Sequence, residues 1–191
     1  RIWHRDFDDV HIVGCPDESL VGMTVGQVAQ ERSIHACDAF LDLVVAHGQA
    51  FRWRTTIANH RSKVLEKMLA APDVHVGFSD SGAHLRNMAF YNFPLLLLKR
   101  AKEAQDQPKP FMTIERAVHR LTGEPADFFD LDAGTLAVGT RADIAVIDPN
   151  ALDDALFDYH EEPMPGMGDL SRMVRRNDRA VTATIIGGRV A

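Results

Sequence analysis

Several features that define protein classes are scarce in this sequence of 191 residues. It has two cysteines, Cys15 and Cys37, whose spacing matches no zinc motif, and two thiols do not make a disulfide framework. We therefore expect reduced thiols in a cytoplasmic protein. The longest apolar run, residues 93–98, is too short to span a bilayer, and we find no signal peptide. The sequence begins at Arg1 rather than at Met, which favours a fragment of a longer chain.

Basic charge is also low. The chain has 21 Lys and Arg against 27 Asp and Glu, a formal net charge of −6. Nucleic-acid binding needs clustered basic residues, so this balance argues against a nucleic-acid partner. The densest basic cluster, residues 172–179, is short and contains Asp178, which favours a solvated face. A composition of 46% hydrophobic and 25% charged residues is typical of a globular protein that can bury a core.

Helices dominate the first two thirds of the expected structure. We expect a strand at 10–14, a helix after the capping box of Thr24 and Gln27, and helices at 34–46, 61–71, 90–104 and after Thr113. The helix at 34–46 places one apolar stripe on a single face: Cys37, Leu41, Val44 and Val45. After residue 131 the pattern becomes β-rich, with a strand in 142–148 and a terminal hairpin turning at Gly187 and Gly188.

The stretch "VHVGFSDSGAH", residues 74–84, is the one that indicates chemistry. Apolar residues alternate from Val74 to Phe78 as in a strand, and Asp80 follows at its end. In an α/β barrel, residues at the carboxyl ends of strands carry the chemistry. A carboxylate there can bind a metal ion or take a proton from water, and His84 can donate a hydrogen bond. The alternative is a simple turn, in which Asp80 caps the next segment.

Two motifs resemble the C-terminal part of the amidohydrolase superfamily, in particular the N-acyl-D-amino-acid deacylases (D-aminoacylases). The first is "GFSDSGAH" at 77–84 and the second is "GTLAVGTRADIAVIDP" at 134–149. The resemblance implies an α/β fold: the C-terminal part of a (β/α)8 TIM-like barrel over residues 1–131, and part of a small composite β-sandwich domain over 132–191.

The resemblance also implies an activity. Such enzymes hydrolyse an amide bond with water activated by one or two metal ions, usually zinc. Asp80 matches their proton-transfer carboxylate, which also serves as a metal ligand in two-metal sites. His84 matches a second catalytic residue. Residues on the loop beyond the strand are candidate contacts to the substrate: Ser81, Arg86, Asn87 and Tyr91.

The metal site implied by the resemblance is incomplete in this sequence. Its first element is His-x-His, and none of the nine histidines forms that motif. A catalytic zinc needs about three protein ligands, so Asp80 alone does not hold one. We therefore expect the zinc of the complete enzyme to take most of its ligands from outside this chain, and the chain alone to be inactive.

An open part of a barrel leaves unpaired strand edges and an uncovered apolar face. We therefore expect the chain to pack against a missing N-terminal part, a second chain or a copy of itself, with no nucleic-acid or membrane partner. The substrate implied by the resemblance is a small N-acyl amino acid. Two alternatives stay open: a non-catalytic assembly module derived from an amidohydrolase, and a cyclic-amide hydrolase of the hydantoinase or dihydroorotase kind.

Overall fold

The computed structural model describes residues 6–77, 79, 84, 86, 88–175 and 177–191. The chain divides into two compact units, residues 1–65 and 66–191, which we describe separately. The α/β character expected from the sequence is present, with helices and antiparallel strands in both units. No closed barrel occurs among the described strands. None of the helices built from described residues has the length and apolar character that a bilayer crossing requires.

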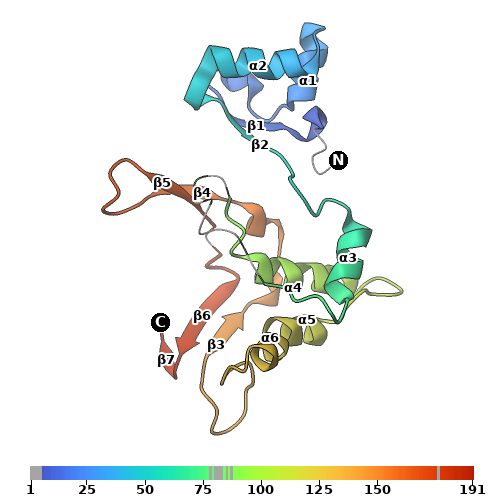
Figure 1. Cartoon of the computed structure of the whole chain (residues 1–191), viewed down its shortest axis with the longest axis vertical. Helices are drawn as coiled ribbons and strands as arrows, with labels where there is room; N and C mark the ends of the chain where they lie inside the picture. Colours follow the sequence, from blue (N-terminus) through green and yellow to red (C-terminus); the bar gives the residue numbers. More distant parts are fainter. Residues whose placement is uncertain (1–5, 78, 80–83, 85, 87, 176) are drawn as a thin grey trace. The chain divides into compact units, whose positions relative to one another are not determined.

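The first unit combines a short strand pair with two α-helices (Figure 1). These are β1 (His11–Gly14), α1 (Val25–Arg32), α2 (Ala36–His47) and β2 (Arg52–Arg54). Strands β1 and β2 pair antiparallel. The predicted capping box begins α1: the Thr24 hydroxyl accepts from Gln27 N at 3.1 Å, and Gln27 Oε1 accepts from Thr24 N at 2.8 Å.

The core of this unit contradicts the predicted stripe on α2. Ala39 and Leu43 are the buried apolar residues of the helix, packed with Ile12, Val25 and other side chains. The four residues of the predicted stripe are instead exposed, Val45 to 85% of its full accessibility. The helix is apolar on more than one side, and periodicity alone does not tell which side the neighbouring elements cover.

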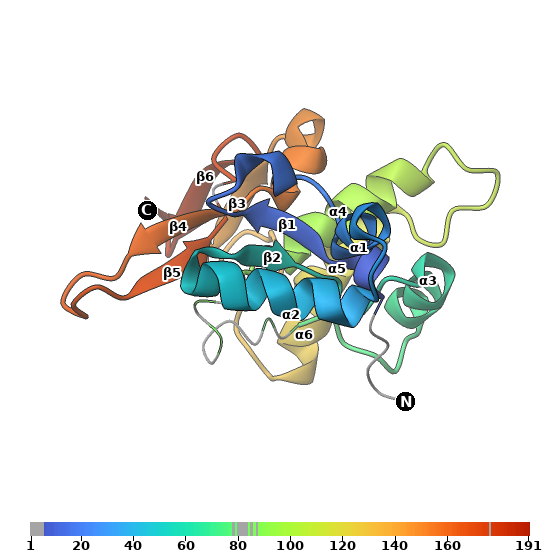
Figure 2. The same ribbon diagram turned by 90° about the horizontal axis from the view of Figure 1, so that it is seen from above.

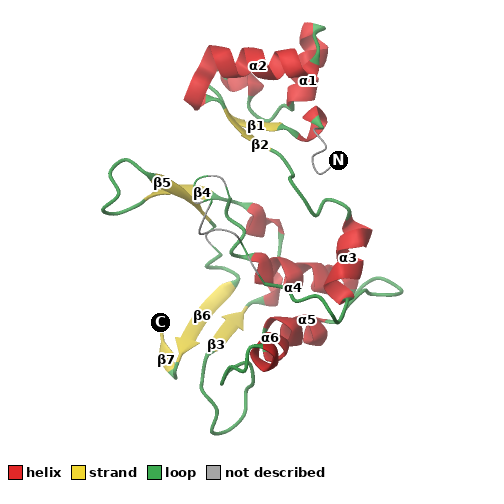
Figure 3. Cartoon of the chain, in the orientation of Figure 1, coloured by secondary structure: helices red, strands yellow, loops and turns green. Residues whose placement is uncertain are grey.

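The described residues of the second unit form four α-helices, two short 3-10 helices and five strands, coloured by type in Figure 3. The helices are α3 (Ser62–Ala70, which begins in the first unit), α4 (Phe93–Ala104), α5 (Ile114–Leu121) and α6 (Gly123–Phe128). The strands are β3 (Ile144–Ile147), β4 (His160–Pro163), β5 (Ser171–Val174), β6 (Val181–Ile186) and β7 (Arg189–Val190). They form an antiparallel sheet in the order β3-β6-β7 and a separate β4-β5 ribbon, which is seen from two sides in Figures 1 and 2.

Helix α4 is the centre of the second core. Its buried residues Leu95, Leu97, Leu98 and Ala101 pack with residues 151, 152 and 156, which follow β3, and with Ala180 before β6. One core thus contains residues from both sides of position 131. The predicted boundary there, between a barrel part (1–131) and a β-sandwich part (132–191), stays a prediction. The predicted terminal hairpin is confirmed between β6 and β7, where Gly187 and Gly188 adopt φ values of 56° and 80°.

The strand predicted from Val74 to Phe78 is wrong for its described residues. Residues 74–77 and 79 take no strand conformation, although Val74 and Val76 are half-buried and Val76 packs against the core around α4. A barrel strand is held by hydrogen bonds to parallel neighbours. No such neighbour occurs among the described strands, all of which pair antiparallel.

Candidate functional site

The candidate site lies on the segment from residue 71 to residue 92. Of the predicted site residues, Asp80, Ser81 and Asn87 lie outside the described residues. His84 and Arg86 are described, and both are exposed. Tyr91 is also exposed, and its hydroxyl accepts a hydrogen bond from the backbone N–H of Arg175. The structure therefore locates the surroundings of the motif rather than the complete predicted set.

The N-terminal end of this segment is bound by an arginine from α5. The side chain of Arg120 has no exposed surface, and its guanidinium donates to the carbonyl of Ala71 at 2.8 Å and to that of Val74. Residues 71–77 have no regular secondary structure, so their carbonyls lack the partners that a sheet supplies. A carbonyl that loses water without gaining a donor is costly, and the guanidinium of Arg120 supplies such donors here.

Glu124 balances this buried charge. Its Oε2 lies 2.6 Å from Nη2 of Arg116, and its Oε1 lies 3.7 Å from Nη1 of Arg120. Two histidines lie near the same carboxylate at 4.0 Å, His75 from the segment itself and His119 from α5. The cluster pairs the cationic side chains of α5 with a carboxylate of α6, and buried charges normally need such pairing.

The C-terminal end of the segment is bound by a second arginine. Arg175 Nε donates to the carbonyl of Ala89 at 2.6 Å, and its Nη1 donates to the carbonyl of Leu156 at 3.0 Å. Its backbone N–H reaches the hydroxyl of Tyr91. One residue that follows β5 thus makes two contacts to the chain just beyond the motif and one to the 3-10 helix Asp154–Phe157.

Asn92, the residue before α4, completes this polar group. It is buried, and its Nδ2 donates to the Leu156 carbonyl at 2.9 Å and to Oδ1 of Asn177 at 3.2 Å. The Leu156 carbonyl therefore accepts from both Asn92 and Arg175. Asn92 Oδ1 is buried and has no protein partner among the described residues.

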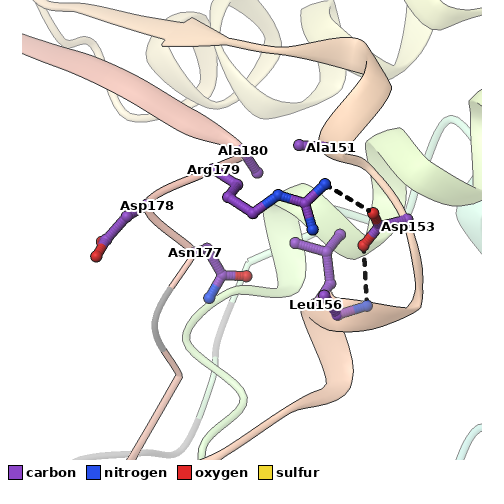
Figure 4. Close-up of a pocket in the computed structure, with 8 residues that line it drawn as sticks. Ala151, Asp153, Leu156, Asn177, Asp178, Arg179 and Ala180 are labelled. Carbon is purple, nitrogen blue, oxygen red and sulfur yellow. Dashed lines mark hydrogen bonds and ion pairs between the residues drawn. The ribbon is translucent and has the colours of Figure 1, made fainter.

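Two shallow cavities lie beside this group. One, of about 270 Å³, is lined by Tyr91, Arg172, Val174 and Arg175. The other, of about 210 Å³, is shown in Figure 4. Arg179 spans one side of it and pairs with Asp153 at 3.4 Å, while Asp178 points away. An arginine-lined cavity suits an anionic group such as a carboxylate, and the first cavity borders the predicted substrate contact Tyr91.

The described residues do not fit a catalytic metal ion by themselves. No group of three His, Cys, Asp or Glu side chains with metal-binding geometry occurs in the described part of the chain. Cys15 and Cys37 are free thiols. The expectation that most zinc ligands come from outside this chain is in keeping with the described donor set, and it stays a prediction.

The model of the amidohydrolase family matches residues 2–191. The chain belongs to the amidohydrolase family. It is 58% identical over 190 residues to an uncharacterized protein of Mycobacterium tuberculosis (strain ATCC 25618 / H37Rv), a match that covers 99% of this chain and 31% of that protein. A dihydroorotase of Anaeromyxobacter dehalogenans (strain 2CP-C) is 42% identical over 82 residues, covering 41% of this chain and 18% of the enzyme. The chain thus spans about a third of the length of its Mycobacterium relative.

Solved structures confirm the predicted relationship at the level of the fold. The N-acyl-D-glutamate deacylase of Bordetella bronchiseptica, solved with zinc and a phosphonate inhibitor, aligns with a TM-score of 0.52 at 21% identity. The alignment covers 96% of this chain and 34% of the deacylase. A D-aminoacylase aligns with a TM-score of 0.50 at 18% identity, covering 95% of this chain and 34% of the enzyme. The resemblance noted in the sequence is therefore confirmed.

Sequence reasoning missed three residues around the motif. Arg175 belongs to the basic cluster that was expected to be a solvated face; Arg172 and Arg179 are exposed as predicted, but Arg175 is half-buried and binds carbonyls. Arg120 and Asn92 gave no signal as functional residues. The spacing of Arg116, Arg120 and Glu124, four residues apart along α5 and α6, is the one local pattern that points to the ion-pair cluster.

Proposed function

We propose that this chain is part of a hydrolase that cleaves the amide bond of N-acyl-D-amino acids. The observation that carries the proposal is the family match over residues 2–191, which includes the motif around Asp80. The fold-level likeness to an N-acyl-D-glutamate deacylase and to a D-aminoacylase supports this choice of substrate class. Membership of the family supports hydrolysis of carbon–nitrogen bonds in general.

In this proposal Asp80 is the group that moves the proton. Its carboxylate takes a proton from the attacking water and passes it to the leaving amine, since an amine leaves readily only when protonated. His84 donates a hydrogen bond to the oxygen that gains negative charge. Ser81, Arg86, Asn87 and Tyr91 contact the substrate, and a guanidinium suits its carboxylate.

The proposed cofactor is zinc, bound mainly by residues from outside this chain. When bound, such an ion polarises the amide carbonyl and lowers the pKa of water. Asp80 is the ligand that this chain contributes in the proposal. The 191-residue chain is then inactive by itself, because the described residues hold no set of three ligands.

A second candidate is the hydrolysis of a cyclic amide. The 42% identity to a dihydroorotase over 82 residues favours it. The proton transfer assigned to Asp80 is the same in both reactions, so the two candidates differ in substrate and not in chemistry. A non-catalytic module is the remaining alternative, and it predicts neither bound metal nor turnover.

The test is zinc content together with hydrolysis. Zinc per chain is measured on a longer protein that carries this chain and on the 191-residue chain alone. Both are assayed with N-acetyl-D-amino acids, their L-enantiomers and dihydroorotate. Asp80→Asn should abolish turnover, whereas Asp73→Asn, an exposed carboxylate in a turn at the start of the same segment, should leave it unchanged.

The outcomes separate the alternatives. Zinc and turnover of the D-substrates in the longer protein, with loss on Asp80→Asn, supports the deacylase. Turnover of dihydroorotate alone supports the cyclic-amide reaction. A longer protein with neither zinc nor turnover supports the non-catalytic module and contradicts the proposal.

We further propose that the preceding part of a longer chain is the protein partner, located in the cytoplasm. The match covers 99% of this chain but only 31% of its Mycobacterium relative, and both thiols are free, as in a reducing compartment. The exposed apolar residues of α2, among them Leu41 and Val45, then contact that preceding part. A monodisperse monomer of the 191-residue chain that binds no hydrophobic dye would contradict this partner.

A further inference from the structure

We infer that Arg120 and Arg175 are positioning residues for Asp80. They bind backbone carbonyls near the two ends of the segment 71–92, which carries Asp80. This inference rests on the proposed function, in which Asp80 moves the proton. Both arginines lie outside the two motifs at 77–84 and 134–149. Each makes its contacts from an element far along the chain, α5 for Arg120 and the residues after β5 for Arg175.

The segment needs such support because its backbone lacks a hydrogen-bonded ladder among the described residues. Residues 71–77 and 88–91 contain neither helix nor strand. Their half-buried stretches nevertheless keep strong carbonyl acceptors, which need donors when water is excluded. A carboxylate that transfers a proton must be held within fractions of an ångström of its substrate, so the chain on both sides of it has to be fixed.

Arg120 supplies donors on the N-terminal side. Its guanidinium reaches the carbonyls of Ala71 and Val74, and the side chain is completely buried. Lysine is a poor substitute, because a single ammonium group does not reproduce the planar fork that serves two separate carbonyls. Glu124 keeps the buried charge paired at 3.7 Å.

Arg175 supplies donors on the C-terminal side. Its Nε binds the carbonyl of Ala89 at 2.6 Å, and Nη1 binds that of Leu156 at 3.0 Å. The Leu156 carbonyl also accepts from Asn92, which is buried at the start of α4. The chain beyond the motif is thereby joined to α4 and to the 3-10 helix Asp154–Phe157, both of which contribute to the main core of the second unit.

The test uses lysine substitutions, which keep the positive charge and remove the second donor arm. Arg120→Lys and Arg175→Lys are compared with two control variants of exposed arginines, Arg141→Lys and Arg189→Lys. Arg141 pairs with Asp143 at 2.8 Å, and Arg189 lies in β7. Backbone hydrogen exchange is measured on the 191-residue chain, and kcat and KM on a longer protein that carries it.

We expect amide exchange in residues 71–77 to rise about ten-fold or more in Arg120→Lys, and in residues 88–92 in Arg175→Lys, since each loses a charge-assisted bond. Exchange in α4 should stay unchanged. In the longer protein kcat should fall about ten-fold or more with KM within about two-fold, because Asp80 acts in the transition state. Both controls should retain wild-type exchange and kcat.

Three results separate the possibilities. Unchanged exchange in both lysine variants overturns the inference. Exchange that rises equally in α4 assigns the arginines to general stability and also overturns it. Exchange that rises locally in the 191-residue chain, together with a wild-type longer protein that hydrolyses none of the substrates, refutes the proposed function and leaves the anchoring of this segment supported.

Discussion

Replacing Asn92 by aspartate tests the polar group behind the candidate site most directly. The substitution exchanges one NH2 group for oxygen at nearly constant volume. In the wild type that NH2 donates at 2.9 Å to the Leu156 carbonyl and at 3.2 Å to Oδ1 of Asn177. An ionised carboxylate has no proton to donate, so three oxygen atoms face one another in a site where residue 92 is 6% exposed.

The magnitude follows from the cost of charge at that position. Burial and the two acceptors both favour the neutral acid, so the pKa of the new carboxyl rises in the folded state. An ionised carboxylate that faces two acceptors in a buried site, with no donor, costs about 3–4 kcal/mol of stability at pH 8. Asn92→Ala is the control: it removes the donor without adding charge, and Leu156 O still accepts from Arg175 at 3.0 Å. The control should cost about 1–2 kcal/mol at every pH.

The pH dependence has a definite sign. With a raised folded-state pKa, the folded Asn92→Asp protein binds more protons than the unfolded one from about pH 4 up to that raised value, so its stability falls as the pH rises through this range. Urea unfolding followed by far-ultraviolet circular dichroism at pH 5 and pH 8 measures it. The aspartate variant should be less stable than the alanine variant at pH 8, and the gap should narrow by more than half at pH 5. An aspartate penalty that is equal at both pH values would refute the reasoning.

Two further predictions concern other parts of the molecule. Burial would lower the pKa of Lys99, but the hydrogen bonds to the carboxylates of Glu103 and Asp154 outweigh burial and raise this pKa. The two ion pairs therefore stabilise the folded protein below the unfolded pKa of about 10.4. This stabilisation is lost as the pH rises through the folded-state pKa. Lys99→Met should cost about 1 kcal/mol at pH 8 and less at pH 11, measured by urea unfolding. Leu43→Ala should cost about 2–4 kcal/mol, whereas Leu41→Ala on the exposed side of α2 should stay within about 0.5 kcal/mol. Equal losses for the two leucines in the same assay would contradict the observed orientation of the helix.

The parts of the fold that the sequence predicts well are those encoded within a few residues. Thr24 and Gln27 form their capping box without help from distant residues, and Thr113 begins α5 by accepting from the backbone N–H of Arg116. The turn at Gly187 and Gly188 likewise depends on the φ values that glycine tolerates. Each of these signals and its structural consequence lie within one turn of the chain.

Predictions failed where the outcome depends on a neighbour. Alternation from Val74 to Phe78 describes a side-chain pattern, but a strand also requires a paired strand, and none is present among the described residues. The stripe on α2 failed for a related reason. Periodicity shows that Leu41 and Val45 share a face, and only the packing of the other elements shows that Leu43 faces the core instead.

The candidate site divides along the same line. Asp80 and His84 were singled out by a local motif, and their roles stay predictions. The roles of Arg120 and Arg175 could not be predicted from the sequence, because their partners are distant main-chain carbonyls. Those partners lie 49 and 46 residues from Arg120, and Ala89 lies 86 residues from Arg175. From sequence alone, an arginine is expected to be a solvated charge. A role in binding the backbone can be predicted only when the carbonyls that lack a hydrogen-bond donor are known. Which carbonyls lack a donor depends on where regular structure ends, so the roles of Arg120 and Arg175 can be recognised only once the fold is known.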